Sequence, residues 1–190
     1  MIGFEVDFSD GHPERLKRPD LPFGLTDNHA DHTDRLDKCE NFQEVFSLVK
    51  RSVKETLGRE RAGLMLYLAD LPLGLGAYHE VGSNGIVMNR ALLEQVKRTA
   101  DSKREINSFV YSILLHEYIH TLGCIDETET RRLTYMVSRE TFGFDHIATK
   151  MAEDGPWAYL KLYPQSRTYG YGRDVEIVKD FEVPDCRYIS

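Results

Sequence analysis

The stretch Leu115–Gly123, "LHEYIHTLG", places two histidines and a glutamate in a segment that is otherwise largely apolar. His116 and His120 are four residues apart, so on an α-helix they lie on one face, one turn from each other, and both imidazoles can reach a single point. Glu117 lies about 100° around the helix axis from His116. Its carboxylate can approach a water at that point without becoming a ligand. The stretch therefore predicts a metal site on a helix, with a glutamate beside it.

The surrounding residues are apolar as well. Residues 106–122, "INSFVYSILLHEYIHTL", predict a helix that is apolar nearly all round, and Gly123 can end it in the left-handed conformation. Such a helix is typical of the centre of a fold, where a polar group without a partner costs on the order of 1–3 kcal/mol. Zinc would satisfy the two histidines, and it would lower the pKa of a bound water to roughly 7, which gives Glu117 a proton to abstract. The alternative is that both histidines are hydrogen-bonded core residues.

A resemblance to a known family rests on this stretch. Residues 116–126, "HEYIHTLGCID", resemble the zincin metallopeptidase signature. In the longer form H-E-x-x-H-x-x-G-x-x-D they are similar to the metzincin-type pattern whose third zinc ligand is an aspartate. With the continuation "ETETRRL", the chain looks most like the small bacterial and archaeal proteins described as minimal zincins. The resemblance implies a zinc metallopeptidase that acts on a peptide or protein substrate, with Glu117 as general base.

Three residues are candidates for the third zinc ligand, since catalytic zinc usually has three protein ligands and a water. Asp126 is preferred, because Gly123 lets the chain turn sharply and return a carboxylate towards the ion. Asp126 could equally cap the next helix. Glu140 follows His120 at a distance that resembles the thermolysin-like branch, and His146 is the third candidate.

Periodicity along the rest of the chain predicts an α+β fold in one domain, residues 1–190. The resemblance implies a zincin-like arrangement, in which a small mixed sheet packs on helices around a central active-site helix. Helices are expected at 41–57, 90–100, 106–122, 126–143 and 146–154, and strands at 2–8, 62–70, 74–82, 85–89 and 174–178. Apart from its first strand, the segment 1–40 is expected to be irregular, and 165–190 is expected to form an irregular tail that could cover the cleft.

The resemblance also suggests how a substrate would bind. In zincins an extended peptide pairs with an edge strand of the sheet, and the strands at 74–82 and 85–89 are the candidates. His79 could stabilise an oxyanion there, or it could be an exposed strand residue. In such enzymes a tyrosine often helps to polarise the carbonyl; four downstream residues are available, Tyr159, Tyr163, Tyr169 and Tyr171, and most of them are expected to pack in the fold.

Other residues carry weaker hypotheses. The thiol of Cys186 could occupy the fourth zinc position and keep the enzyme latent. His29 and His32 could form a second metal site, although a solvated loop is the ordinary interpretation. Met136 and Met151 are available for a methionine turn beneath the metal, but core packing explains both better.

The amino-acid composition limits the partners and the cellular location that we expect for this protein. The net charge is −7, and basic residues are interleaved with acidic ones, so we expect no nucleic-acid partner. The first residues do not show the pattern of a leader, no apolar run reaches membrane-spanning length, and three widely spaced cysteines do not suggest disulfides. These features predict a soluble cytoplasmic protein without a membrane partner, and they do not indicate an oligomeric state.

The favoured function is a zinc-dependent metallopeptidase. One alternative is a non-proteolytic binding or regulatory protein that keeps the zincin scaffold and a structural zinc. Another is a zinc hydrolase of a non-peptide amide. The intact H-E-x-x-H motif favours the peptidase, because a structural ion would not need Glu117.

Overall fold

The computed structural model describes residues 2–5, 28–72, 74–160 and 174–182. In chain order the elements are β1 (Ile2–Glu5), α1 (Asn28–Lys38), α2 (Phe42–Leu57), β2 (Met65–Ala69), β3 (Leu75–His79), β4 (Gly85–Asn89), α3 (Arg90–Thr99), α4 (Lys103–Thr121), α5 (Glu127–Phe142), α6 (Ile147–Asp154), α7 (Pro156–Leu160) and β5 (Glu176–Ile177). The α+β class predicted from the sequence is confirmed.

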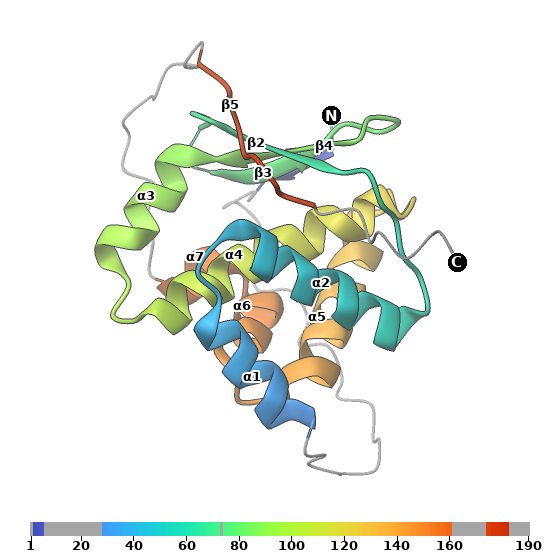
Figure 1. The fold of residues 1–190 in the computed structure, drawn as a ribbon, viewed down its shortest axis with the longest axis vertical. Coiled ribbons are helices and arrows are strands. Elements are labelled where there is room, and N and C mark those ends of the chain that lie inside the picture. The colour runs from blue at the N-terminus through green and yellow to red at the C-terminus, as the bar shows by residue number, and fades with distance from the viewer. Residues whose placement is uncertain (1, 6–27, 73, 161–173, 183–190) are drawn as a thin grey trace.

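The strands form one mixed sheet with the order β1-β3-β4-β2-β5. β2 and β4 pair in parallel, and the other neighbours are antiparallel. Figure 1 shows the sheet at the top of the view, with α2, α4, α5 and α6 below it. The strands predicted at 74–82 and 85–89 form an antiparallel hairpin, β3 and β4, but neither is an edge strand: β1 covers the outer edge of β3, and β4 lies between β3 and β2. The expectation that one of them offers a free edge to a substrate is therefore wrong for this structure.

Helix α4 is the centre of the fold. It contacts α1, α2, α3, α5, α6 and β3, and every residue from Asn107 to Thr121 is buried. The helix begins at Lys103, three residues before the predicted start, because Ser102 is an N-cap whose hydroxyl accepts a hydrogen bond from Glu105 N–H. The Glu105 carboxylate reaches back to the N–H of Asp101 at 2.8 Å, so residues 101–105, which lie between two predicted helices, contain a helix start.

Helix α1 corrects the prediction that residues 1–40 are irregular after the first strand. It is largely polar, and two ion pairs one turn apart, Asp31–Arg35 and Asp34–Lys38, support it. Leu36 is fully buried, and the Asn107 side chain of α4 donates a hydrogen bond to its carbonyl. A helix with so few apolar residues gives no clear 3.6-residue pattern, which is why the sequence does not reveal it.

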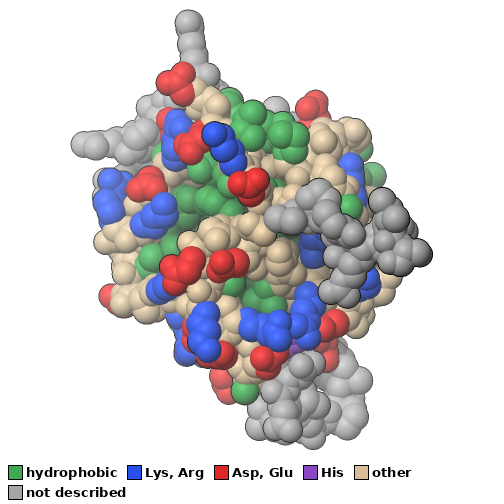
Figure 2. Space-filling view, viewed as in Figure 1, with side chains coloured by type: hydrophobic (Ala, Val, Ile, Leu, Met, Phe, Trp, Pro, Cys, Tyr) green, Lys and Arg blue, Asp and Glu red, His purple; other side chains and the backbone are tan. Residues whose placement is uncertain are grey.

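The last strand, β5, lies at the edge of the sheet opposite to β1. β5 pairs with β2 and lies within the strand predicted at 174–178, while 165–173 and 183–190 of the predicted tail lie outside the described residues. Figure 2 shows acidic and basic side chains interspersed over the visible face. Within the described ranges, no helix combines the length and the apolar character needed to cross a bilayer.

Candidate metal centre

Helix α4 brings the two histidines of the motif together. The Nε2 atoms of His116 and His120 are 3.1 Å apart, and both side chains are buried. Their separation of one helical turn produces this approach, as the sequence pattern predicts. On a strand, residues four positions apart also share a face, but they lie about 13 Å apart, so a strand would not bring the two rings together.

The carboxylate that approaches this pair belongs to Glu127, not to Asp126. Glu127 is the first residue of α5, and its two oxygens lie 3.2 Å from His120 Nε2 and 3.4 Å from His116 Nε2. Gly123 makes the sharp turn between α4 and α5 with a φ of +93°. Asp126 instead caps α5, where its Oδ1 accepts a hydrogen bond from Glu129 N–H at 2.8 Å. The sequence therefore predicted the turn at Gly123, but it expected Asp126 to approach the histidines, whereas in the structure the neighbouring Glu127 does.

The other two candidates for the third ligand lie elsewhere. Glu140 is exposed on α5, and its carboxylate accepts a hydrogen bond from Arg139 at 2.6 Å. His146 caps α6, where its Nδ1 accepts a hydrogen bond from Ala148 N–H. In the described part of the chain, His116, His120 and Glu127 are the one group of three such side chains whose ligand atoms converge.

The donor set fits a divalent cation. His120 Nδ1 lies 2.6 Å from the carbonyl oxygen of Cys124, which can only accept, so this nitrogen carries the proton and Nε2 presents its lone pair. That lone pair faces the carboxylate of Glu127 and the imidazole of His116. Ligands about 2.0–2.1 Å from a tetrahedral zinc are roughly 3.3 Å apart, which matches the distances between these atoms.

The orientation of His120 has its own support. Thr130, which is fully buried in α5, donates from Oγ1 towards the same Cys124 carbonyl at 3.3 Å. Outer contacts of this kind fix the tautomer and the ring orientation of a ligating histidine. The loop between α4 and α5 therefore holds the His120 ring of α4 in place through its backbone.

Glu117 is a buried carboxyl group at the side of this centre. Its exposed fraction is 1%, and among the described residues neither carboxyl oxygen has a hydrogen-bond partner of ordinary geometry. Burial, together with the negative charge of Glu127, raises its pKa well above the usual value, while the nearby backbone of His79 acts in the opposite direction. A carboxylate in this environment readily takes up a proton.

The protonation of the other two groups suits metal binding. Burial lowers the pKa of His116 and so favours the neutral imidazole, although Glu127 acts in the opposite direction. Burial alone would raise the pKa of Glu127, but the contacts of its carboxylate with the His116 and His120 rings outweigh burial and lower the pKa. A neutral imidazole and an ionised carboxylate are the forms that bind metal.

His79 is buried on β3 and is not an exposed strand residue. Its Nδ1 lies 2.9 Å from the carbonyl oxygen of Gly85 and therefore donates to it. Burial lowers the pKa of the ring, which favours the neutral form with a bare Nε2. A bare nitrogen cannot donate to an oxyanion, so the geometry does not support that role. The backbone of His79, close to Glu117, is the part that belongs to the site.

The remaining predicted residues are not part of this centre. His29 hydrogen-bonds the Glu140 carbonyl and His32 pairs with Glu55, so the two rings serve different contacts. Met151 is fully buried in the core, Met136 is half-buried on α5, and Tyr159 is half-buried against the core. Tyr163, Tyr169, Tyr171 and Cys186 lie outside the described residues.

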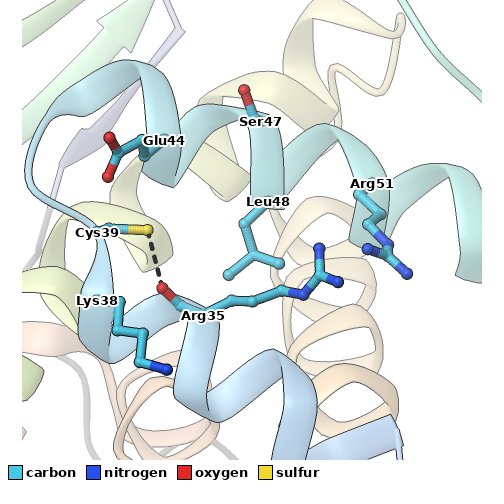
Figure 3. Close-up of a pocket in the computed structure, with 7 residues that line it drawn as sticks. All are labelled: Arg35, Lys38, Cys39, Glu44, Ser47, Leu48 and Arg51. Carbon is cyan, nitrogen blue, oxygen red and sulfur yellow. Dashed lines mark hydrogen bonds between the residues drawn. The ribbon is translucent and has the colours of Figure 1, made fainter.

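A separate hollow lies between α1 and α2, with a volume of about 380 Å³ (Figure 3). Arg35, Lys38 and Arg51 line it, but each forms an ion pair with an acid one turn away on its own helix. The hollow contains none of the converging metal-ligand atoms. It is therefore distinct from the candidate metal centre.

Comparisons of the chain with protein-family models, with curated proteins and with solved structures found no match.

Proposed function

We propose that this chain is a zinc-dependent peptidase, with His116, His120 and Glu127 as the zinc ligands and Glu117 as the general base. Zinc held by these residues would polarise the scissile carbonyl and acidify the attacking water. The protein's own contribution is to hold the three ligands, to position Glu117 and to keep that carboxylate able to accept a proton. The substrate would be a peptide or a protein segment.

The ligand set supports a catalytic rather than a structural role for the ion. Catalytic zinc sites typically have three protein ligands and an open position, whereas structural sites are closed by four. The converging group among the described residues has three members. The side chain of Glu127 is 37% exposed, so the centre reaches the surface on that side and a substrate could approach it.

Glu117 carries the proposed chemistry. Its carboxylate would take a proton from the water as the water oxygen bonds to the scissile carbonyl carbon. The same carboxyl group would then pass the proton to the amide nitrogen as the carbon–nitrogen bond breaks, which releases a carboxylic acid and an amine. The raised pKa of Glu117 favours both transfers, because a carboxyl with an ordinary pKa would be a weak base near neutral pH.

The observation that carries the proposal is the buried carboxyl of Glu117, which has no hydrogen-bond partner among the described side chains and lies beside three converging ligands. Keeping a buried carboxyl that has no side-chain partner, and only the His79 backbone nearby, is costly, since an incompletely satisfied polar group costs on the order of 1–3 kcal/mol. A protein whose metal served only its structure would gain nothing from that cost. A role of Glu117 as general base explains why the protein keeps this costly buried carboxyl.

The experiment compares zinc content and hydrolysis in the wild type and Glu117→Gln. The amide has the shape of the carboxylate but cannot act as the base, so we expect one zinc per chain in both proteins and a loss of at least about a hundredfold in the cleavage of a peptide library by the variant. Equal cleavage by both proteins would contradict the proposed mechanism. A wild type that binds zinc and cleaves no peptide would favour the non-proteolytic alternative.

A further inference from the structure

We propose that Arg61 is a positioning residue of this site, which clamps the β3–β4 turn to the end of α4 that carries the metal ligands. The inference rests on the proposed function and extends it to a residue that lies far from the H-E-x-x-H motif in the sequence. Arg61 belongs to the loop between α2 and β2. It has no role in ligating the metal.

One guanidinium group joins the two elements. Its Nη1 donates to the carbonyl oxygen of Thr121 at 2.8 Å, and its Nη2 donates to the carbonyl oxygen of Ser83 at 2.7 Å. Thr121 follows His120 directly, and Ser83 lies in the turn between β3 and β4. Since the guanidinium is planar and rigid, both carbonyl groups are held in one geometry.

The backbone of Arg61 is fixed as well. Its N–H donates to the hydroxyl of Tyr118 at 2.8 Å, and that hydroxyl donates to the Arg61 carbonyl at 3.2 Å. Tyr118 is fully buried in α4 and follows Glu117 directly. The backbone of Arg61 is therefore attached to the same turn of α4 as Glu117.

The β3–β4 turn that Arg61 holds lies next to Glu117. His79, at the end of β3, has its backbone close to Glu117, and its ring donates to Gly85 at the start of β4. Ser83 lies between these two residues in the sequence. A shift of the turn would therefore move the backbone that borders Glu117. The ligands on α4 and α5 would stay in place.

The positive charge of Arg61 strengthens its hydrogen bonds to the carbonyl groups of Thr121 and Ser83. No carboxylate among the described residues forms an ion pair with it, and the hydrogen bonds of its guanidinium go to backbone carbonyls. Hydrogen bonds from a charged donor are roughly twice as strong as neutral ones. A lysine could keep the charge and one of these bonds, but its single ammonium group cannot reproduce the rigid fork.

The test compares Arg61→Met and Arg61→Lys with a matched control, Arg90→Met. Arg90 is a similarly half-buried arginine that bonds Asp70 near the other end of the sheet. For Arg61→Met we expect zinc affinity within about threefold of the wild type and a kcat about 10–100-fold lower, with KM changed less than kcat. Arg61→Lys should recover part of kcat, and Arg90→Met should keep the kcat of the wild type.

Hydrogen exchange provides a readout that does not depend on activity. Arg61→Met should accelerate amide exchange in residues 80–85 and 118–122, whereas Arg90→Met should leave both segments unchanged. If Arg61→Met keeps the kcat of the control, or if its kcat falls only in proportion to lost zinc, the positioning role is wrong. If the wild type cleaves no peptide, the proposed function fails, and the exchange data then decide the clamp: unchanged exchange in both segments would overturn it.

Discussion

Asp126 and Glu127 are adjacent carboxylates that perform different tasks at the start of α5. The short side chain of Asp126 suits the N-cap, because its oxygen reaches the Glu129 N–H three residues ahead. The longer side chain of Glu127 reaches back to both imidazoles. The division of tasks follows from side-chain length at two successive positions.

Substitution at these two positions separates the tasks. We expect Glu127→Gln to weaken zinc binding by more than the roughly 10–100-fold that is typical of a lost outer-shell contact. Asp126→Ala should keep zinc affinity and instead lower the free energy of unfolding by about 1 kcal/mol, because the cap is lost. Competition with a zinc-selective indicator dye and urea unfolding measure the two effects. The assignment is wrong if Asp126→Ala is the variant that loses zinc.

Individual residues also differ in how well the sequence predicts their positions in the site. The roles of His116 and His120 as a converging pair follow from helical spacing alone. The choice between Asp126 and Glu127 depends on where α5 begins, and helix starts are uncertain by one or two residues in any assignment. Arg61 acts through backbone carbonyl groups, which leave no signal in the sequence.

At the scale of elements, the start of α6 contains a cap that depends on pH. His146 Nδ1 accepts a hydrogen bond from Ala148 N–H, which requires that nitrogen to be unprotonated. Burial, together with the positive charges of Arg104 and Lys150 and against the negative charge of Asp37, lowers the pKa of His146 from 6.5 to about 4. The unfolded chain therefore binds this proton more readily than the folded one.

It follows that the contribution of His146 to stability is present above pH 6.5 and is lost as the pH falls towards 4. The full shift corresponds to an upper bound of about 3 kcal/mol. We expect His146→Asn, which retains a capping side chain, to lose less stability than the wild type between pH 7 and pH 4.5. Urea unfolding at both pH values, in a chelator, measures the difference. Equal losses in both proteins would contradict this account.

The close packing of β3 on neighbouring helices leads to a second prediction at the scale of elements. A Cβ added at Gly76 would lie 2.8 Å from Ile113 Cδ1 and 2.8 Å from Trp157 Cη2, whereas one added at Gly74 would meet nothing within 4 Å. Gly76→Ala should therefore lower the free energy of unfolding by about 1–3 kcal/mol through overpacking.

Gly74→Ala is the matched control and should change stability by less than about 1 kcal/mol. Chemical denaturation of both variants compares them directly. If the two substitutions have the same effect, the close packing of β3 on α4 does not limit the residue at position 76.

Elements differ in how well the sequence predicts them. Amphipathic α2 and the apolar strands follow from their periodicity, because burial on one face imposes it. Helix α1 does not, because ion pairs and contacts with α4 and α5 support a segment that is largely polar. The early start of α4 follows from a capping pair, Ser102 and Glu105, whose side chains bond to the backbone rather than to the core.

At the scale of the whole molecule, the candidate centre joins two consecutive helices, the central α4 and α5, which packs against it. His116 and His120 belong to α4, and Glu127 belongs to α5. A ligand that binds only the folded state stabilises it, by about 2.7 kcal/mol at a concentration 100 times its dissociation constant. Zinc should therefore stabilise the entire fold.

This expectation is tested by thermal unfolding with zinc and with a chelator. The wild type should show a higher Tm with zinc, and Glu127→Gln should lose most of that difference, because one ligand is missing. Arg90→Met serves as the control and should respond to zinc as the wild type does. A zinc response that persists in full in Glu127→Gln would mean that the ion stabilises the protein from another site.

The overall arrangement was less accessible from the sequence than its parts. The pairing of Ile2 with His79 joins strands that are far apart in the chain, and no local pattern specifies it. The sequence predicts the β3–β4 hairpin through its turn residues, but the place of that hairpin within the sheet depends on β1 and β2. Sheet order is set by the packing of the whole molecule, which local propensity does not contain.

The most direct test of the central claim is anomalous X-ray diffraction from zinc-loaded crystals at the zinc absorption edge. We predict one strong peak per chain, about 2.0–2.2 Å from Nε2 of His116, Nε2 of His120 and a carboxylate oxygen of Glu127, with Glu117 outside the coordination shell. The account is contradicted if no peak appears between these three side chains, or if Glu117 is itself a ligand.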